Sequence, residues 1–167
     1  MFRTLKRIAK SFKYSLIGIM YCLRCERNFR IHTFAALTVL FIAPLYDLTS
    51  LQSKLLAITI FLVLIMEMLN TAIENIVDMV TEDYHKLACV VKDLSAGAVG
   101  LSAISALVVG YFTLIRDIDL IATFAPLLTP LRLTLTVAFL TAGIFMIFMP
   151  LHNKKVEGEK IEGGKKS

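Results

Sequence analysis

Cysteine is scarce in this chain of 167 residues: there are three, and two of them, Cys22 and Cys25, form an isolated C-x-x-C pair. A redox or zinc centre would need a thioredoxin-like context or further Cys and His ligands, and the sequence shows neither. The same scarcity excludes a disulfide framework. We therefore expect Cys22 and Cys25 to be packing residues beside the membrane, with their thiols in a reducing compartment.

No basic stripe of the kind that binds nucleic acid is present, although the formal net charge is +5. The basic residues lie at the two ends and beside the apolar runs, as they do in membrane proteins. The first thirteen residues also lack the apolar core of a cleavable signal peptide, because charges interrupt them. Since 57% of the residues are hydrophobic, against about 45–50% apolar in soluble domains, we predict a one-domain integral membrane protein.

Two common nucleotide-binding patterns are missing as well. The chain has no G-x-x-x-x-G-K-[ST] P-loop and no set of Gly-rich loop, H-R-D and D-F-G that marks protein kinases. Any phosphoryl transfer by this chain must therefore use a site of another design.

The N-terminal segment is amphipathic. At about 100° per residue, its basic and apolar residues fall on opposite arcs of one helix. This pattern predicts a helix that lies on the membrane surface with its basic side toward the headgroups. The basic arc holds Arg3, Lys6, Arg7, Lys10 and Lys13, and the apolar arc holds Phe2, Leu5, Ile8, Phe12, Leu16 and Ile19.

Four apolar stretches follow. A helix needs about 20 residues to cross the hydrocarbon, so the first stretch is expected to begin near Glu26 and the second to continue to about Val80. The stretches themselves cover about 31–46, 54–66, 94–115 and 131–149. We predict an all-α membrane protein with a surface helix, a three-helix transmembrane bundle and a fourth, C-terminal transmembrane helix.

Lysine and arginine set the expected orientation, because eight of them precede the first span and five lie in the tail. The positive-inside bias places both termini in the cytoplasm, with the loops at 47–53 and 117–130 outside. The third span is rich in small residues, which favour close helix packing and oligomers. The expected units are a surface helix (1–25), a three-span core (26–115), an outer loop with the additional span (116–150) and a basic disordered tail (151–167).

The second span carries a stripe of polar residues. Glu67, Asn70, Glu74 and Asp78 are spaced by three, four and four residues, which places them on one helix face. A carboxylate at this depth costs about 2.5 kcal/mol or more, and such groups usually mark functional sites. Polar contacts between helices are the alternative, although one polar group is enough for that role.

Three clustered acids require cations. Mg²⁺ prefers oxygen ligands from one or two carboxylates together with substrate phosphates. Glu26, where the surface helix meets the first span, is expected to converge with Glu74. Carboxylates for a metal and cations for phosphates are typical of phosphoryl transfer. The nearby cations are Arg27, Arg30, Lys86 and Lys92.

The twelve residues from Glu67 to Asp78, E-M-L-N-T-A-I-E-N-I-V-D, resemble the signature of the prokaryotic diacylglycerol kinase and undecaprenol kinase family. The resemblance extends over about Arg7 to Ile115. Glu26–His32 is similar to the Gram-positive, undecaprenol kinase branch. Further matching positions are Tyr14-Ser15, Gly18, Asp83-Tyr84-His85, Lys92-Asp93 and 96–99.

The resemblance implies a homotrimer with active sites shared between subunits, MgATP as phosphate donor and a membrane-borne alcohol as acceptor. It implies Glu67 as the general base, Arg30 and Glu67 at the lipid substrate, and Mg²⁺ on Glu26 and Glu74. A carboxylate deep in an apolar stretch suits a proton acceptor. The implied nucleotide contacts are Arg7, Tyr14, Glu26, Asn70, Glu74, Asp83, Tyr84, His85, Lys92 and Asp93.

Several interpretations stay open. The leading one is an undecaprenol kinase of the bacterial cytoplasmic membrane with its site on the cytoplasmic face, and the second is a diacylglycerol kinase. An ion or proton transporter would need acids distributed across the bilayer. An assembly protein would tolerate Glu67→Gln. The chain departs from the family pattern in its fourth span, in Leu16, where the enterobacterial branch has tryptophan, and in Asp83, which replaces a glutamate.

Overall fold

The computed structural model describes residues 2–80, 85–116 and 119–150, and every regular element in these ranges is helical. This confirms the predicted all-α class. The long helices are α1 (Phe2–Cys25), α2 (Arg27–Ile42), α3 (Ser50–Val80), α4 (Lys86–Gly110) and α6 (Pro130–Phe148). The short ones are η1 (Ala43–Leu45), η2 (Tyr111–Ile115), α5 (Leu120–Phe124) and η3 (Ala125–Leu128). The expected tail at 151–167 lies outside the described residues.

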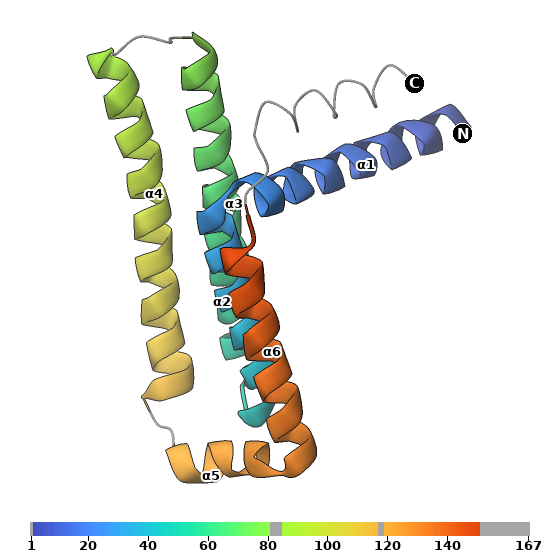
Figure 1. Cartoon of the computed structure of the whole chain (residues 1–167), viewed down its shortest axis with the longest axis vertical. Coiled ribbons are helices and arrows are strands. Elements are labelled where there is room, and N and C mark those ends of the chain that lie inside the picture. The colour runs from blue at the N-terminus through green and yellow to red at the C-terminus, as the bar shows by residue number, and fades with distance from the viewer. Residues whose placement is uncertain (1, 81–84, 117–118, 151–167) are drawn as a thin grey trace.

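Four helical segments in the described part of the chain are long and apolar enough to cross a membrane: α2 with η1, α3, α4 with η2, and α6. They run side by side, while α1 projects away from them (Figure 1). α3 does continue to Val80, as expected, and its 31 residues correspond to about 46 Å of helix. Since the hydrocarbon is about 30 Å thick, α3 extends beyond it.

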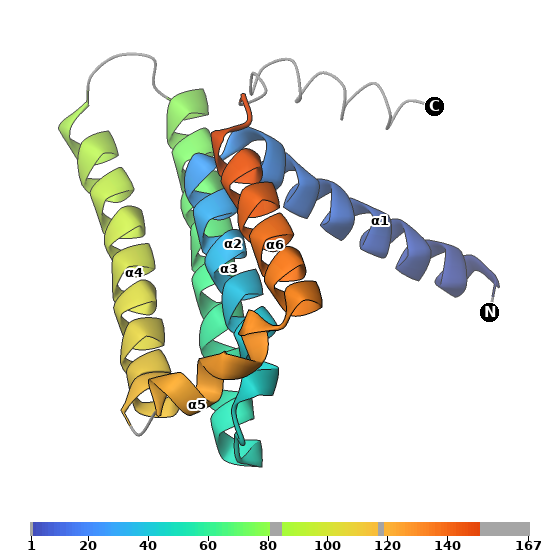
Figure 2. The ribbon, with the colours of Figure 1, turned by 60° about the horizontal axis from the view of Figure 1, so that its bottom comes forward.

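The bundle has α3 at its centre. α3 packs along α4 on one side and against α2 on the other, and α6 packs against α2. The two ribbon views agree that α4 and α6 lie at opposite edges (Figures 1 and 2). Both the end of α6 and the start of α2 lie at the end of the bundle from which α1 projects. The chain therefore brings the α1–α2 junction next to the C-terminus of α6.

Aromatic stacking and one glycine join α6 to α2. The Phe139 ring stacks on Phe34 and Phe41, with centroid distances of 5.5 Å and 4.7 Å. Gly143 is buried against Phe34: a Cβ atom there would lie 1.8 Å from the Phe34 ring. Small residues allow membrane helices to approach closely, and here the missing side chain makes room for the ring.

The connection that was expected to be an outer loop contains α5 and η3. The Asp119 carboxylate accepts hydrogen bonds from the backbone N–H groups of Ile121 and Ala122, at 3.1 Å each. This is an N-cap, which satisfies amides that a helix start leaves unpaired. Pro126 lies in the first turn of η3, where the missing N–H of proline is tolerated. These two local signals explain why the segment is partly helical.

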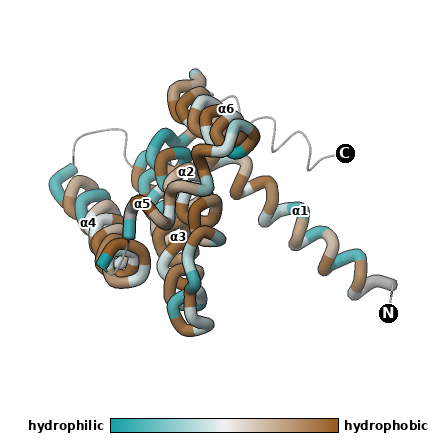
Figure 3. Tube along the Cα trace, turned by 90° about the horizontal axis from the view of Figure 1, so that it is seen from below, coloured by the Kyte–Doolittle hydropathy of each residue, from teal (hydrophilic) through white to brown (hydrophobic). Residues whose placement is uncertain are grey.

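Polar residues form a large share of the interior, while most long apolar side chains face outward. This distribution suits a protein surrounded by lipid, because lipid tails solvate apolar side chains. α1 alternates between hydrophilic and hydrophobic positions (Figure 3), as predicted for an amphipathic helix. Cys22 and Cys25 are buried near its end, as expected for packing residues. The buried polar residues are Arg30, Thr59, Glu67, Asn70, Thr71, Ser95 and Ser102.

Candidate active site

The polar stripe of α3 passes from the interior to the surface. Glu67 is 3% exposed and Asn70 is 7% exposed, whereas Glu74 is half-buried and Asp78 is exposed. α3 is long enough for this change, because its last turns reach past the apolar part of the bundle. The stripe thus offers one carboxylate in a dry environment and others closer to water.

A short chain of hydrogen bonds crosses from α4 to α3 at this point. The Ser95 hydroxyl donates to Asn70 Oδ1 at 2.6 Å, and Asn70 Nδ2 donates to Glu74 Oε1 at 3.0 Å. Because Asn70 is held on both sides, the Glu74 carboxylate has a defined orientation. Sequence reasoning identified Ser95 only as a small residue. Its position three residues after Lys92, on the same face of α4, is the signal that could have revealed it.

Lys92 forms an ion pair with Asp78, with 2.5 Å between Nζ and Oδ1. The Lys92 and Asp78 side chains are 38% and 60% exposed. Ion pairs with this exposure contribute only about 0–1 kcal/mol, because water screens them. The Lys92 ammonium group can therefore exchange Asp78 for phosphate oxygens at little cost in free energy.

Glu26 lies at the break between α1 and α2. It is the N-cap of α2 and has extended backbone angles, with φ −116° and ψ 117°. The negative charges of Glu26 and Glu74 both act on Glu67 by electrostatic repulsion. Two acids of α3 and one at the α1–α2 junction thus act on the same region of the bundle, while the expected convergence of Glu26 with Glu74 stays a prediction.

The acids fit Mg²⁺ as a donor set. Within residues 2–80, 85–116 and 119–150, no group of three or more His, Cys, Asp or Glu side chains is arranged to hold a metal ion. Mg²⁺ needs fewer, because it binds to one or two carboxylates together with substrate phosphates and water. Glu26 and Glu74 supply two hard oxygen donors beside Glu67.

Arg30 is 3% exposed, and its guanidinium group donates hydrogen bonds to four backbone carbonyls. Nε donates to Leu23 and Nη2 to Arg24, while Nη1 donates to Met146 and Met149. The side chain therefore lies where α1, α2 and α6 meet. Its predicted contact with the lipid substrate stays a prediction.

The remaining predicted residues that the structure describes are exposed. Arg7 and Tyr14 are exposed on α1, which projects from the bundle (Figure 1). About 18 Å of helix separates Tyr14 from Glu26. His85, the N-cap of α4, and Asp93 are exposed. The remaining two, Asp83 and Tyr84, lie outside the described residues.

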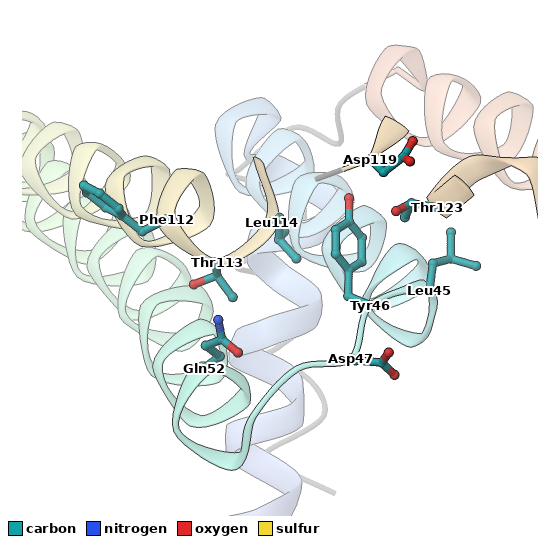
Figure 4. A pocket seen from close by; sticks show the side chains of 9 residues that line it. All are labelled: Leu45, Tyr46, Asp47, Gln52, Phe112, Thr113, Leu114, Asp119 and Thr123. Atoms are coloured by element: carbon teal, nitrogen blue, oxygen red, sulfur yellow. The ribbon is translucent and has the colours of Figure 1, made fainter. Parts of the chain in front are cut away.

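A separate hollow of about 260 Å³ lies at the opposite end of the bundle (Figure 4). None of the predicted site residues lines it. Burial raises the pKa of the Tyr46 phenol there. The hollow is formed by Leu45, Tyr46, Asp47, Gln52, Phe112, Thr113, Leu114, Asp119 and Thr123.

Known proteins are similar to this chain in sequence. A family model described as prokaryotic diacylglycerol kinase matches residues 13–114. A Synechocystis diacylglycerol kinase is 48% identical over 101 residues, which are 60% of this chain but only 58% of that relative. The Bacillus subtilis undecaprenol kinase is 39% identical over 106 residues, 64% of this chain and 86% of the relative. The Escherichia coli K12 diacylglycerol kinase is 35% identical over 102 residues, 61% and 84% of the two chains.

Four apolar spans, the carboxylate stripe and these relatives define the class of protein: a multi-pass bacterial membrane lipid kinase. The chain belongs to the prokaryotic diacylglycerol kinase family. The family match ends at residue 114, so α5, η3 and α6 lie beyond it. The fourth span is therefore an addition to the matched core in this chain.

Proposed function

We infer that the chain transfers the γ-phosphate of ATP to the hydroxyl group of a membrane lipid, with undecaprenol as acceptor. The observation that carries this is the buried Glu67 beside the carboxylates of Glu26 and Glu74. The Glu26–His32 segment and the Bacillus subtilis relative support undecaprenol. Diacylglycerol is the second candidate, because the Synechocystis relative has the higher identity and is named a diacylglycerol kinase.

Glu67 is the general base in this proposal. Its carboxylate takes the proton of the lipid hydroxyl while that oxygen forms a bond to the γ-phosphorus of ATP. The bond between the γ-phosphorus and the bridging oxygen breaks, and ADP leaves with that oxygen. The dry surroundings of Glu67 suit this role, because a poorly solvated carboxylate is a stronger proton acceptor. Arg30 remains a proposed contact to the lipid.

Glu26 and Glu74 are the proposed magnesium ligands. When bound, Mg²⁺ neutralises phosphate charge during transfer. The hydrogen bonds from Ser95 to Asn70 and from Asn70 to Glu74 support this assignment, because they hold the Glu74 carboxylate in place. Carboxylates that bind a metal are commonly held in place by hydrogen bonds from residues that do not themselves bind the metal.

The nucleotide is proposed to lie against the exposed end of the stripe. Lys92 exchanges its weak ion pair with Asp78 for phosphate oxygens. Asn70 lies beside the phosphates between Glu67 and Glu74. The other proposed contacts are Arg7, Tyr14, Asp83, Tyr84, His85 and Asp93.

A homotrimer with shared sites is part of the proposal. Arg7 and Tyr14 lie on a helix that projects from its own bundle, so in an assembly they are available to a neighbouring subunit. α4 also offers an open face: a Cβ atom added at Gly97 or Gly100 would meet no atom within 4 Å. Such faces let another helix approach closely.

The site is proposed to face the cytoplasm, together with both termini. The Lys and Arg excess before α2 and after α6 supports this orientation. All the proposed site residues then lie where ATP is available.

The test is phosphate transfer from ATP by the full chain in mixed detergent–lipid micelles, with undecaprenol and diacylglycerol offered separately. We expect Mg²⁺-dependent transfer that falls by about 10²–10⁴-fold in Glu67→Gln, the range for loss of a general base. Leu69→Met, an exposed apolar change two residues away, serves as the control and should leave transfer unchanged.

Each other outcome has a defined meaning. A folded protein that phosphorylates neither lipid would overturn the proposed function. Transfer to diacylglycerol alone would overturn undecaprenol as the substrate. Full activity in Glu67→Gln would show that Glu67 is not the general base and would favour a packing role for the stripe.

A further inference from the structure

The carbonyls that bind Arg30 belong to two helix ends. Leu23 and Arg24 lie in the last turn of α1, and Met146 and Met149 lie at the end of α6. The last carbonyls of a helix have no partner within it, and the C-terminal end of a helix favours a cation. One buried guanidinium group thus meets the partial negative charge of two helices.

Local sequence explains why these carbonyls are available. α1 stops because Glu26 leaves the helical conformation, so the amides that would bond Leu23 and Arg24 in a continuous helix belong to α2. In α6, the residue four positions after Met146 is Pro150, which has no N–H to donate. The Arg30 hydrogen bonds replace these missing partners.

The position of Arg30 links α6 to a proposed metal ligand. Glu26 lies between Arg24, whose carbonyl binds the guanidinium at 2.8 Å, and Arg30 itself. The backbone N–H of Arg30 also donates to the Glu26 carbonyl, at 3.4 Å. The Arg30 side chain therefore connects the helices on the two sides of Glu26. Two of its four hydrogen bonds go to the end of α1 and two to the end of α6.

We propose that α6 is a positioning element for the active site: by docking on Arg30 it fixes the α1–α2 junction and thereby the Glu26 carboxylate. Arg30 is the positioning residue through which α6 acts. The proposal rests on the proposed function only in taking Glu26 as a magnesium ligand. It gives a role to the span that lies beyond the family match.

A substitution at the contact between Gly143 and Phe34 can weaken the packing of α6 on α2 in the full chain. In Gly143→Leu the new side chain occupies the space of the Phe34 ring, so the ring or α6 must shift and the packing of α6 on α2 is disturbed. Ala142→Leu makes a similar enlargement one residue away at an exposed position and is the matched control. Phe139→Ala, which removes the stacking but adds no volume, is the milder second variant.

Phosphate transfer is measured against MgCl₂ concentration, with lipid and ATP varied separately. We expect Gly143→Leu to raise the Mg²⁺ concentration for half-maximal activity about tenfold, the scale for losing an outer support of a metal ligand. Ala142→Leu should match the parent protein. Phe139→Ala should give a smaller shift in the same direction. A lower kcat with an unchanged Mg²⁺ requirement would overturn the proposal.

A second measurement does not depend on activity. Backbone amide exchange of residues 22–30, followed by mass spectrometry, should accelerate in Gly143→Leu and not in Ala142→Leu. Unchanged exchange at this junction would overturn the proposal. Faster exchange in a protein that phosphorylates no lipid would support the docking and overturn the proposed function alone. If Gly143→Leu does not fold, Phe139→Ala decides both measurements.

Discussion

The two edges of the bundle are held by different interactions. Where α4 meets α3, side chains bond to side chains: Ser95 to Asn70 and Lys92 to Asp78. Within α3, Asn70 in turn bonds to Glu74. Where α6 meets α2, the contacts are stacked aromatic rings, a glycine and a guanidinium group bound to backbone carbonyls. The polar edge carries groups that can bind ligands, whereas the aromatic edge carries groups that hold a helix in place.

This difference has a physical basis. Side-chain carboxylates, amides and amines can exchange their partners for phosphate or metal without loss of the helix that bears them. Backbone carbonyls at helix ends and rings packed against a glycine cannot be exchanged so easily, because the helices would have to separate. We therefore expect mutations at the polar edge to change catalysis first and mutations at the aromatic edge to change stability or position first.

The largest expected effect at the polar edge comes from Glu74→Gln. The amide keeps the size of the side chain but removes a hard anionic ligand for Mg²⁺. Transfer at low millimolar Mg²⁺ should fall about 100-fold and recover in part as MgCl₂ is raised. A loss of activity that no Mg²⁺ concentration relieves would argue against Glu74 as a metal ligand.

Ser95→Ala tests the hydrogen bond that crosses from α4 to α3. Without it Asn70 is free to turn, and the Glu74 carboxylate loses its orientation. We expect about a tenfold loss in kcat/KM for MgATP with little change in unfolding midpoint. Ser102→Ala is the matched control, because the Ser102 hydroxyl is also buried but bonds to the Val99 carbonyl in its own helix. Equal losses in the two variants would contradict the expectation.

At the aromatic edge, Phe139→Ala should lower stability. Two stacked pairs are lost, each worth about 0.5–1.5 kcal/mol beyond buried area, so the free energy of unfolding should fall by at least about 1–3 kcal/mol. Reversible unfolding in mixed micelles by increasing SDS measures this change. Activity at saturating Mg²⁺, per folded molecule, should remain near that of the parent, and a selective loss of activity there would break the distinction between the two edges.

The smallest expected change is that of Asp78→Asn. The ion pair with Lys92 is exposed, so its loss should change the free energy of unfolding by less than about 1 kcal/mol. Because Lys92 no longer has to leave Asp78, the KM for MgATP should fall slightly or stay constant. A clear rise in this KM would show that Asp78 itself supports the nucleotide.

The stripe from Glu67 to Asp78 and the four spans could be predicted because both depend on spacing within one segment. A 3.6-residue period places residues three and four apart on one face, and hydropathy marks a span before any partner helix is known. The expected extension of α3 to Val80 followed from the same argument. The N-cap at Asp119 is also a local signal, and it was missed only because the segment 117–130 was treated as a loop.

The contacts of Ser95, Arg30 and Gly143 could not be predicted in the same way. Each depends on how one helix is rotated and shifted relative to another, and neither hydropathy nor periodicity contains that information. Ser95 was indistinguishable from the other small residues of its span. The hydrogen bonds of Arg30 to the end of α6 could not be expected, because nothing in the sequence indicates that α6 reaches it. The catalytic and binding roles of the site residues remain predictions.

By itself, the sequence determined that this protein is helical and membrane-embedded, and that it carries three carboxylates on one face of a span. These properties follow from hydropathy and helix period, which act within a segment. Only the tertiary structure decided that Ser95 bonds to Asn70 and that α6 docks on Arg30. These are contacts between segments far apart in the chain, and packing between helices in the bilayer selects them.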